Sequence, residues 1–573
     1  ITDSGALVIT GETTLAAGSS NDITLDHTSN DFQGGLIITS GNNVTLVDTG
    51  AIILGAATVS GTYTVTAGGA ITDSGTQEIA GVTTIAAGSG NDITLNTSTN
   101  NFAAAVVITS GNNVTLVDED AIALGASTIS GTYTLTAGGA VTDTGALAIT
   151  GVTTIAAGSG NNITLDHTSN NFQAAVIITS GNNVTLVDAG AIDLGASTVS
   201  GTYAVTATAG GDITDSGVLA ITGGATFTVA NGRSITLDQS STFSSTVTFV
   251  ASSGTIAAVT INDSNAFDLK ALTTTGNLTV TAGGAVTDSG TLVIPGTATI
   301  SASGQAVTLD ESSNNFGTLV VTGANVAATD RNAIILGAAT VSGTYGITAG
   351  GAVTDSGTQE ITGVTTISAS GQNVTLDTAT NNFADEVRIT GAAVTVVDED
   401  AIDLGASTVT GAYSVTADGA VTNSGALAIT GTTTISASGR NVTLNTATNN
   451  FQGAVGITGA NVSVVDAGAI VLGASTVSGT YAVTATAGGD ITDTGVLAIS
   501  GTSALTAADG QSIILDESST FATVAFVASS GNLKNVEIKD SNAFDLSALT
   551  LAKVGGAGGD LTVIAGGAVT NSG

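Results

Sequence analysis

The sequence predicts an all-β fold, a parallel β-helix (solenoid) with about three coils in each repeat of roughly 70 residues. Three observations lead to this prediction. One phrase returns at a nearly fixed period, apolar and polar residues alternate with period two, and Gly, Asn, Asp and Ser separate the alternating runs. A fixed period of this length indicates a repeat architecture in which each turn contacts only its neighbours.

The pentad [IV]-T-[DN]-[ST]-G marks the start of each repeat. It begins at Ile1, Ile71, Val141, Ile213, Val286, Val353, Val421, Ile491 and Val569. A longer phrase, GTYAVTATAGGDITDSGVLAIT at residues 201–222, returns almost unchanged at 479–500. We therefore predict two four-repeat units of one continuous β-helix, at 1–285 and 286–568. Each unit ends in a divergent fourth repeat, at 213–285 and 491–568, and a further repeat starts at 569–573. Because VTNSG at 569–573 restarts the opening phrase, we expect a stretch of a longer array.

Residues 61–130 illustrate the strands expected in one repeat. Runs such as TYTVTA, DITLN and NVTLVD alternate apolar with polar residues and are bounded by turn residues, which is typical of half-buried strands. About nine such runs group in threes, one group per coil. No segment keeps a helical apolar spacing, and the single proline, Pro295, leaves nearly every backbone N–H free for strand ladders.

Corner residues and aromatic residues fit the same prediction. Asn at stacked corners can form ladders between coils. The tyrosines all occur in G-[TA]-Y, and one set of phenylalanines follows Asn or Asp. We expect both sets to fill the core, with a binding platform as the alternative. The residues are Tyr63, Tyr133, Tyr203, Tyr345, Tyr413 and Tyr481, and Phe32, Phe102, Phe172, Phe316, Phe383 and Phe451.

The composition excludes several classes of partner. The formal net charge is −37 with only 8 Lys and Arg, so we expect no nucleic acid partner, because phosphate neutralisation needs clustered basic residues. No uninterrupted run of 18 apolar residues occurs, and we expect no membrane insertion. Cysteine is absent, so no disulfide or thiolate metal site can form.

The acidic triplet D-E-D occurs at Asp118–Asp120 and Asp398–Asp400. A glycosidase needs two carboxylates at a set separation. Sibling repeats place TG or AG at the last two positions of the triplet, so we interpret both triplets as solvated turns, with a weak calcium site at acidic corners as the alternative.

Three further patterns are candidate sites. GSGNDITL at 88–95 is a poor match to a calcium-binding nonapeptide and is interpreted as a turn before a strand. His27 and His167 share one repeat position and have no second histidine or cysteine nearby. Outward Thr columns on a flat face could bind ice, but neighbouring coils place Ala or Val in the same column. The sequence therefore predicts no catalytic, cofactor-binding or metal-binding residue.

Tandem phrases such as VTLVDAGAIDLGASTVSG (184–201) and GTYTVTAGGAITDSG (61–75) resemble the β-strand repeats of filamentous-haemagglutinin-like giant surface exoproteins and adhesins of Gram-negative bacteria. The resemblance implies a right-handed parallel β-helix and adhesive or structural work at the extracellular cell surface. We expect a non-enzymatic structural shaft of a filament or giant adhesin. Its expected partners are further copies of the repeat end to end, lateral copies of itself, and a cell-surface or carbohydrate receptor. The alternatives are a carbohydrate-active β-helix enzyme and a calcium- or ice-binding repeat protein.

Overall fold

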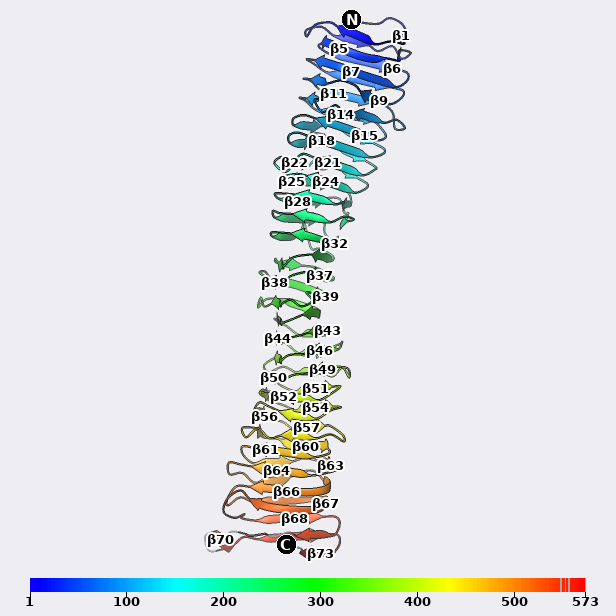
Figure 1. The fold of residues 1–573 in the computed structure, drawn as a ribbon. Coiled ribbons are helices and arrows are strands. Elements are labelled where there is room, and N and C mark those ends of the chain that lie inside the picture. The colour runs from blue at the N-terminus through cyan, green and yellow to red at the C-terminus, as the bar shows by residue number, and fades with distance from the viewer. Residues whose placement is uncertain (547–548, 552, 555–556, 572–573) are drawn as a thin grey trace. The chain divides into compact units, whose positions relative to one another are not determined.

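The computed structural model describes residues 1–546, 549–551, 553–554 and 557–571, and every regular element in these residues is a β-strand. The strands stack in parallel as a β-solenoid of about 26 turns, which confirms the predicted parallel β-helix (Figure 1). Among the described strands, β70 (Lys553–Val554) and β71 (Ala557–Gly558) form the antiparallel pair. The right-handed sense stays a prediction.

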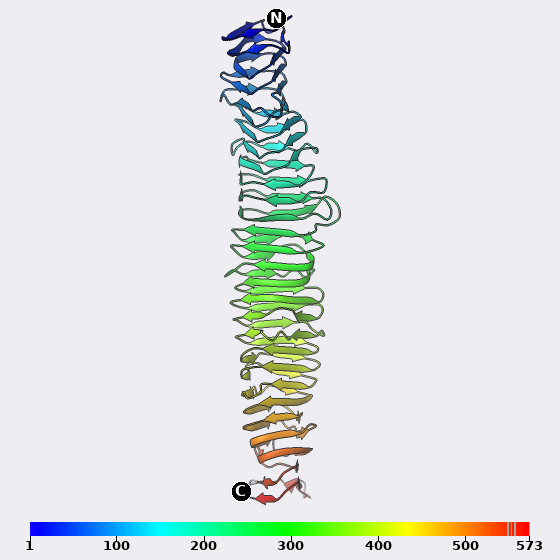
Figure 2. The same cartoon turned by 90° about the vertical axis from the view of Figure 1, so that its right-hand side faces the viewer.

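The chain divides into two compact units, residues 1–284 and 285–573, which are described separately. Of the predicted start of a further repeat at 569–573, residues 572 and 573 lie outside the described residues. Figure 2 shows the strands of each unit stacked one on another.

Two long stacks of paired strands build the first unit, and we call them stack A and stack B. Stack A is a twelve-stranded sheet made of β3 (Ile23–Leu25), β6 (Val44–Asp48), β8 (Tyr63–Ala67), β11 (Thr83–Ala86), β14 (Val106–Ser110), β16 (Ile122–Leu124), β19 (Val141–Asp143), β22 (Ile163–Leu165), β25 (Val184–Asp188), β28 (Tyr203–Ala207), β31 (Ala225–Val229) and β33 (Val247–Ala251). Stack B consists of β2 (Thr13–Ala16), β5 (Gly35–Gly41), β7 (Ile52–Val59), β9 (Ile71–Asp73), β12 (Ile93–Leu95), β15 (Val114–Asp118), β18 (Tyr133–Ala137), β21 (Thr153–Ala156), β24 (Val176–Ser180), β26 (Ile192–Leu194), β29 (Ile213–Asp215), β32 (Ile235–Phe243), β34 (Val259–Asp263) and β37 (Leu278–Ala282).

Short strands complete the turns of the first unit between the two stacks. They are β1 (Val8–Ile9), β4 (Asp31–Phe32), β10 (Gln77–Ile79), β13 (Asn101–Phe102), β17 (Ser127–Ile129), β20 (Leu147–Ile149), β23 (Asn171–Phe172), β27 (Ser197–Val199), β30 (Leu219–Ile221), β35 (Phe267–Leu269) and β36 (Leu272–Thr273).

The second unit repeats this plan with stack C and stack D. Stack C consists of β38 (Val286–Asp288), β40 (Val307–Leu309), β42 (Val326–Asp330), β44 (Tyr345–Ala349), β47 (Thr365–Ser368), β50 (Val387–Gly391), β52 (Ile402–Leu404), β55 (Val421–Asn423), β58 (Val442–Leu444), β61 (Val462–Asp466), β64 (Tyr481–Ala485), β66 (Leu497–Ala507), β67 (Ile513–Ala528), β69 (Phe544–Leu546) and β73 (Val569–Asn571).

Stack D consists of β39 (Leu292–Ser301), β41 (Asn315–Gly323), β43 (Ile334–Val341), β45 (Val353–Asp355), β48 (Val374–Leu376), β51 (Val394–Asp398), β54 (Tyr413–Ala417), β57 (Thr433–Ser436), β60 (Ala454–Gly459), β62 (Ile470–Leu472), β65 (Ile491–Asp493), a part of β67, β68 (Val536–Asp540) and β72 (Leu561–Ala565). Short strands between the stacks are β46 (Gln359–Ile361), β49 (Asn382–Phe383), β53 (Ser407–Val409), β56 (Leu427–Ile429), β59 (Asn450–Phe451) and β63 (Ser475–Val477).

The register of stack A gives the number of turns in a repeat. Tyr63 and Tyr203, two repeats apart, both lie in stack A and are separated by seven pairing steps, from β8 through β11, β14, β16, β19, β22 and β25 to β28. Tyr133, one repeat after Tyr63, lies in stack B. One repeat therefore makes three and a half turns, so equivalent residues of successive repeats lie on alternate stacks. The number of turns per repeat is therefore slightly larger than the three coils that the sequence predicts.

The core lies between the two stacks of each unit. Strands alternate buried and exposed positions, as in β15, where Val114, Leu116 and Asp118 point inward. All six tyrosines and the six phenylalanines of the repeated motif are at most 2% exposed, which confirms that they fill the core. In the first divergent repeat the Phe227 ring lies 6.1 Å from Tyr203 and 6.2 Å from Phe249. Phe227 and Phe249 stand in register with Val205 and Leu186, so two rings continue a column that is aliphatic in the preceding turns.

Corners are held by ladders of Asn and Asp side chains, as the sequence predicts. Oδ1 of Asp22 accepts the backbone N–H of Asn43 at 3.1 Å, and Oδ1 of Asn43 accepts the backbone N–H of Thr62 at 3.1 Å. The same ladder recurs from Asp92 through Asn113 to Thr132. Each bond joins two successive turns, so the ladder fixes the stacking of the corners.

Candidate functional site

The D-E-D triplets place one buried and two exposed acids at the same corner. Asp118 is 2% exposed, whereas Glu119 and Asp120 are exposed. The backbone N–H of Phe102 donates to Oδ2 of Asp118 at 2.8 Å, and the N–H of Asp120 donates to Oδ1 at 2.9 Å. The interpretation as a solvated turn is therefore wrong for Asp118, whose carboxylate ties its corner to the preceding turn.

Asp398 of the second triplet is held in the same way. It is 2% exposed, and its carboxylate accepts the N–H groups of Phe383 and Asp400, both at 2.8 Å. Burial raises the pKa of Asp118 and raises the pKa of Asp398 to about 6. Both oxygens of each buried carboxylate are occupied by backbone donors.

We call this arrangement, in which a buried Asp accepts backbone N–H groups from two turns, the aspartate clamp. It recurs in sibling repeats that lack the two exposed acids. In each case a buried Asp accepts the N–H of a core Phe. The further pairs are Asp48 with Phe32, Asp188 with Phe172, Asp330 with Phe316, and Asp466 with Phe451, at 2.6 to 2.7 Å. A group that recurs in this role through the chain supports a structural function for the buried Asp, because each one joins two consecutive turns.

A second clamp joins the repeat pentad to the N-N-F motif. Asn100 is fully buried, its Nδ2 donates to Oδ2 of Asp73 at 2.7 Å, and its Oδ1 accepts the N–H of Gln77 at 2.9 Å. Asn170 binds Asp143 and Leu147 in the same way, at 2.6 and 2.9 Å. The aspartate of the pentad thus serves as the acceptor for a buried Asn on the following turn.

The divergent repeats break this second clamp. Ser241 and Ser519 stand in place of the buried Asn and still accept the N–H of Leu219 and Leu497, at 3.0 and 2.9 Å. Oδ2 of Asp215 and Oδ2 of Asp493 are buried and have no hydrogen-bond partner. Burial raises the pKa of each of these two carboxyls to about 6. Oδ2 of each Asp has no partner because Ser is shorter than Asn and lacks the amide donor that binds this oxygen in the other repeats.

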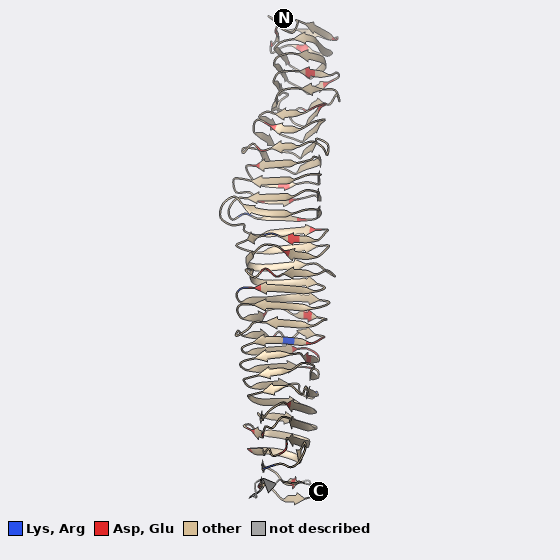
Figure 3. Ribbon diagram, turned by 90° about the vertical axis from the view of Figure 1, so that its left-hand side faces the viewer, with Lys and Arg blue, Asp and Glu red and all other residues tan. Residues whose placement is uncertain are grey.

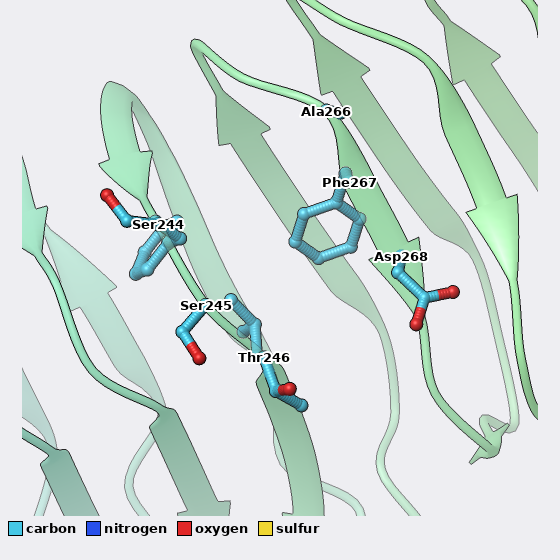
Figure 4. Close-up of a pocket in the computed structure, with 8 residues that line it drawn as sticks. Ser244, Ser245, Thr246, Ala266, Phe267 and Asp268 are labelled. Carbon is cyan, nitrogen blue, oxygen red and sulfur yellow. The ribbon is translucent and has the colours of Figure 1, made fainter.

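A shallow groove of about 210 Å³ lies in the first divergent repeat (Figure 4). Its lining includes Ser244, Ser245 and Thr246 on one side and Phe267 and Asp268 on the other. In Figure 4 the Phe267 ring projects toward the segment that carries the three hydroxyls.

The groove coincides with the end of the stack A ladder at β33. The second unit is one residue shorter here, with STFATVAF at 519–526 against STFSSTVTF at 241–249, and its Val524 pairs with Leu546. The extra serine therefore accompanies the interruption. Asp268 forms an ion pair with Lys270 at 2.6 Å. The groove lining supplies one carboxylate, whereas glycoside hydrolysis uses two.

The other candidates from the sequence also take structural positions. Asp92 of GSGNDITL belongs to the corner ladder described above, and Gly88 has a φ of 81° that suits glycine. Nδ1 of His27 and Nδ1 of His167 accept the N–H two residues on, at 3.2 Å each. Within the described residues no group of three or more His, Cys, Asp or Glu could hold a metal ion. The same part of the chain has no helix long and apolar enough to cross a membrane.

The outward Thr columns are longer than adjacent sequence runs indicate. In stack B the registered neighbours Thr72, Thr94, Thr115, Thr134 and Thr154 occupy five consecutive turns. The predicted Val and Ala interruptions are present in stack A, at Val107 and Ala204. In stack B the column ends at Ile177, a residue type that the prediction did not name. Sequence reasoning missed the buried aspartates although V-T-L-V-D alternation already turns the Asp inward.

The family model described as repeats of unknown function (DUF5649) matches the chain in eight consecutive segments, residues 1–39, 41–109, 111–179, 181–250, 256–322, 323–390, 391–458 and 459–528. These segments cover more than half of the chain. Neither the curated proteins nor the solved structures include a match.

Proposed function

We propose that this chain, which belongs to the family of repeats of unknown function (DUF5649), is the non-enzymatic structural shaft of an extracellular filament or giant bacterial surface adhesin of the filamentous-haemagglutinin-like kind. The observation that carries the proposal is the recurrence of the aspartate clamp. The clamp at Asp48, Asp118, Asp188, Asp330, Asp398 and Asp466 joins successive turns throughout the chain.

The physical logic is that of a one-dimensional polymer. Each turn pairs with the next through backbone ladders, and each repeat adds the same clamps, so added repeats extend the solenoid at a nearly constant free-energy increment. Acidic side chains at the corners, such as Glu119 and Asp120, keep the surface soluble through charge repulsion. The candidate catalytic acids Asp118 and Asp398 are engaged by backbone donors, which supports a role other than chemistry.

End-to-end extension is part of the proposal. Leu561 and Val569, on the last described strands, pair with the buried Val536 and Phe544 but are 41% and 54% exposed. A further turn, from this or another chain, would bury these apolar side chains and pair the open strand edges. Adhesion to a cell-surface or carbohydrate receptor would then belong to another part of the assembly, with the solenoid setting its distance from the cell.

Electron microscopy of the native source, with antibodies raised against the repeat, tests this function. We expect labelled filaments or rods at the cell surface, with turns about 4.8 Å apart along their axis. Labelling of compact particles inside the cell would contradict the proposal. The enzyme alternative is tested by incubating the chain with uncharged and acidic polysaccharides, and release of reducing ends that is lost in Asp268→Asn would favour that alternative.

A further inference from the structure

The outer face of stack A has no charged side chain along its whole length. Its outward positions are half-buried or exposed and carry Thr, Val or Ala. They are Thr24, Thr45, Val47, Thr64, Thr66, Thr84, Ala86, Val107, Thr109, Ala123, Thr142, Thr164, Thr185, Val187, Ala204, Thr206, Thr226, Thr228, Thr248 and Val250. We call this surface the stack A face. Charged residues within its strands lie at inward positions: Asp48 and Asp188 are buried and clamped, and Asp143 is half-buried and accepts a hydrogen bond from Asn170.

The exposed acidic charge of the first unit lies at corners and on other strands instead, such as Glu78 on β10. Asp22, Asp26, Asp92 and Asp166 are exposed just before or just after strands of the stacks. Figure 3 shows the ribbon mainly in tan, with scattered red acidic positions. With a net charge of −37 on the chain, the stack A face is a surface where another molecule can approach without burying a charge.

The corresponding stack in the second unit, stack C, does carry charged side chains on its outer face. In stack C, which carries Tyr345 and Tyr481 as stack A carries Tyr63 and Tyr203, the outward side of β50 presents Arg388, paired with Glu386 at 2.5 Å. Asp403 follows on β52. Stack C therefore provides a charged counterpart with the same repeat positions and the same backbone register.

The stack A face is large enough for a stable dimer. Eleven spacings between its twelve strands, at about 4.8 Å each, give a length of roughly 53 Å. Strands of three to five residues at about 3.3 Å per residue give a width of roughly 13 Å. The product is about 700 Å², close to the roughly 800 Å² per partner of a standard protein interface.

We infer that the stack A face pairs with the same face of a second copy of this chain. A second copy of this solenoid matches the turn spacing by construction. A partner whose period differed by about 0.3 Å from the 4.8 Å turn would be out of step by more than about 3 Å across the face. Threonine is β-branched and stiff, so ordering it costs little side-chain entropy, and facing Thr hydroxyls can hydrogen bond.

This inference goes beyond the proposed function, and a monomeric chain would overturn the pairing while leaving the shaft proposal in place. The test is sedimentation velocity of the whole chain over a range of concentrations, with the double variant Thr164→Glu/Thr185→Glu on the stack A face. The matched control is Thr443→Glu/Ser463→Glu on stack C. Each pair occupies registered neighbours on adjacent turns, adds the same charge, and falls at the same repeat positions.

We expect the wild-type chain to dimerise with a micromolar or tighter Kd. The stack A variant should raise that Kd at least about tenfold, because like charges would face each other, and the control variant should leave it unchanged. Added NaCl should tighten the dimer by screening repulsion between the acidic corners. A wild-type chain that stays monomeric at all concentrations, an equal effect of both variants, or dissociation by salt would each overturn the inference. Circular dichroism melts of both variants check that they fold equally well.

Discussion

Replacing the buried Asn170 by Ser should loosen the solenoid locally by a predictable amount. Asn170 is fully buried, and its Nδ2 donates to Oδ2 of Asp143 at 2.6 Å. The Asn170→Ser change copies the divergent repeats, where Ser241 keeps the bond to a leucine N–H but leaves Oδ2 of Asp215 without a partner. Loss of one hydrogen bond to a charged group costs about 1.5–3 kcal/mol.

Native-state hydrogen exchange is the appropriate assay, because a solenoid opens in parts and a single unfolding midpoint averages over them. The amide of Leu147, which donates to Oδ1 of Asn170 at 2.9 Å, reports the clamp directly. A cost of about 2 kcal/mol should speed its exchange roughly 30-fold.

Asn171→Ser is the matched control, since Asn171 is adjacent in the chain and exposed. Exposed substitutions of this kind stay within about 0.5 kcal/mol. Equal exchange of the Leu147 amide in both variants would refute the argument that this bond holds consecutive turns together.

Two other predictions concern pH and glycine. Asp215, Asp398 and Asp493 have folded pKa values of about 6 against an ordinary 3.8, so the folded state binds more protons between these values. Stability therefore falls as pH rises through them, by at most about 3 kcal/mol for each group and by less where solvent screens the carboxylate. The thermal midpoint should therefore be higher at about pH 5 than at about pH 7.5, and a lower midpoint at pH 5 would contradict this assignment. A Cβ at Gly138 would overlap the carbonyl oxygen of Glu119 on the preceding turn, whereas Gly160 has open space. Gly138→Ala should lower the midpoint and Gly160→Ala should not, and equal midpoints would contradict the close approach of the two turns.

The sequence predicted the class of fold because the evidence for it is local. Alternation such as V-T-L-V-D sets which side chains face inward, and the repeated pentad sets the period. The same alternation places Asp118 inward. The prediction of a solvated turn instead followed the general rule that acidic residues are exposed. The structure shows why the inward position is tolerated, since two backbone N–H groups satisfy the carboxylate.

The half turn in each repeat could not be predicted from the sequence. Strand lengths and turn residues do not specify which strands lie above one another. The stacking pairs residues that are 17 to 25 positions apart, as in Val387 with Leu404 and Val536 with Leu561. The uncharged stack A face also depends on that stacking, because Thr64, Thr84 and Thr142 become part of one surface only when the turns are in register. The groove at Phe267 accompanies one extra serine in the first unit, and the sequence alone indicates only that this repeat is divergent.

A cryo-electron microscopy reconstruction of the isolated chain tests the central claim most directly. The account predicts stacked turns about 4.8 Å apart, with Tyr63 and Tyr203 in one sheet, seven turns and roughly 34 Å apart, and Tyr133 in the other sheet. A map that placed all three tyrosines in one sheet, with six turns between Tyr63 and Tyr203, would contradict the three-and-a-half-turn repeat. A map without stacked turns would contradict the solenoid itself.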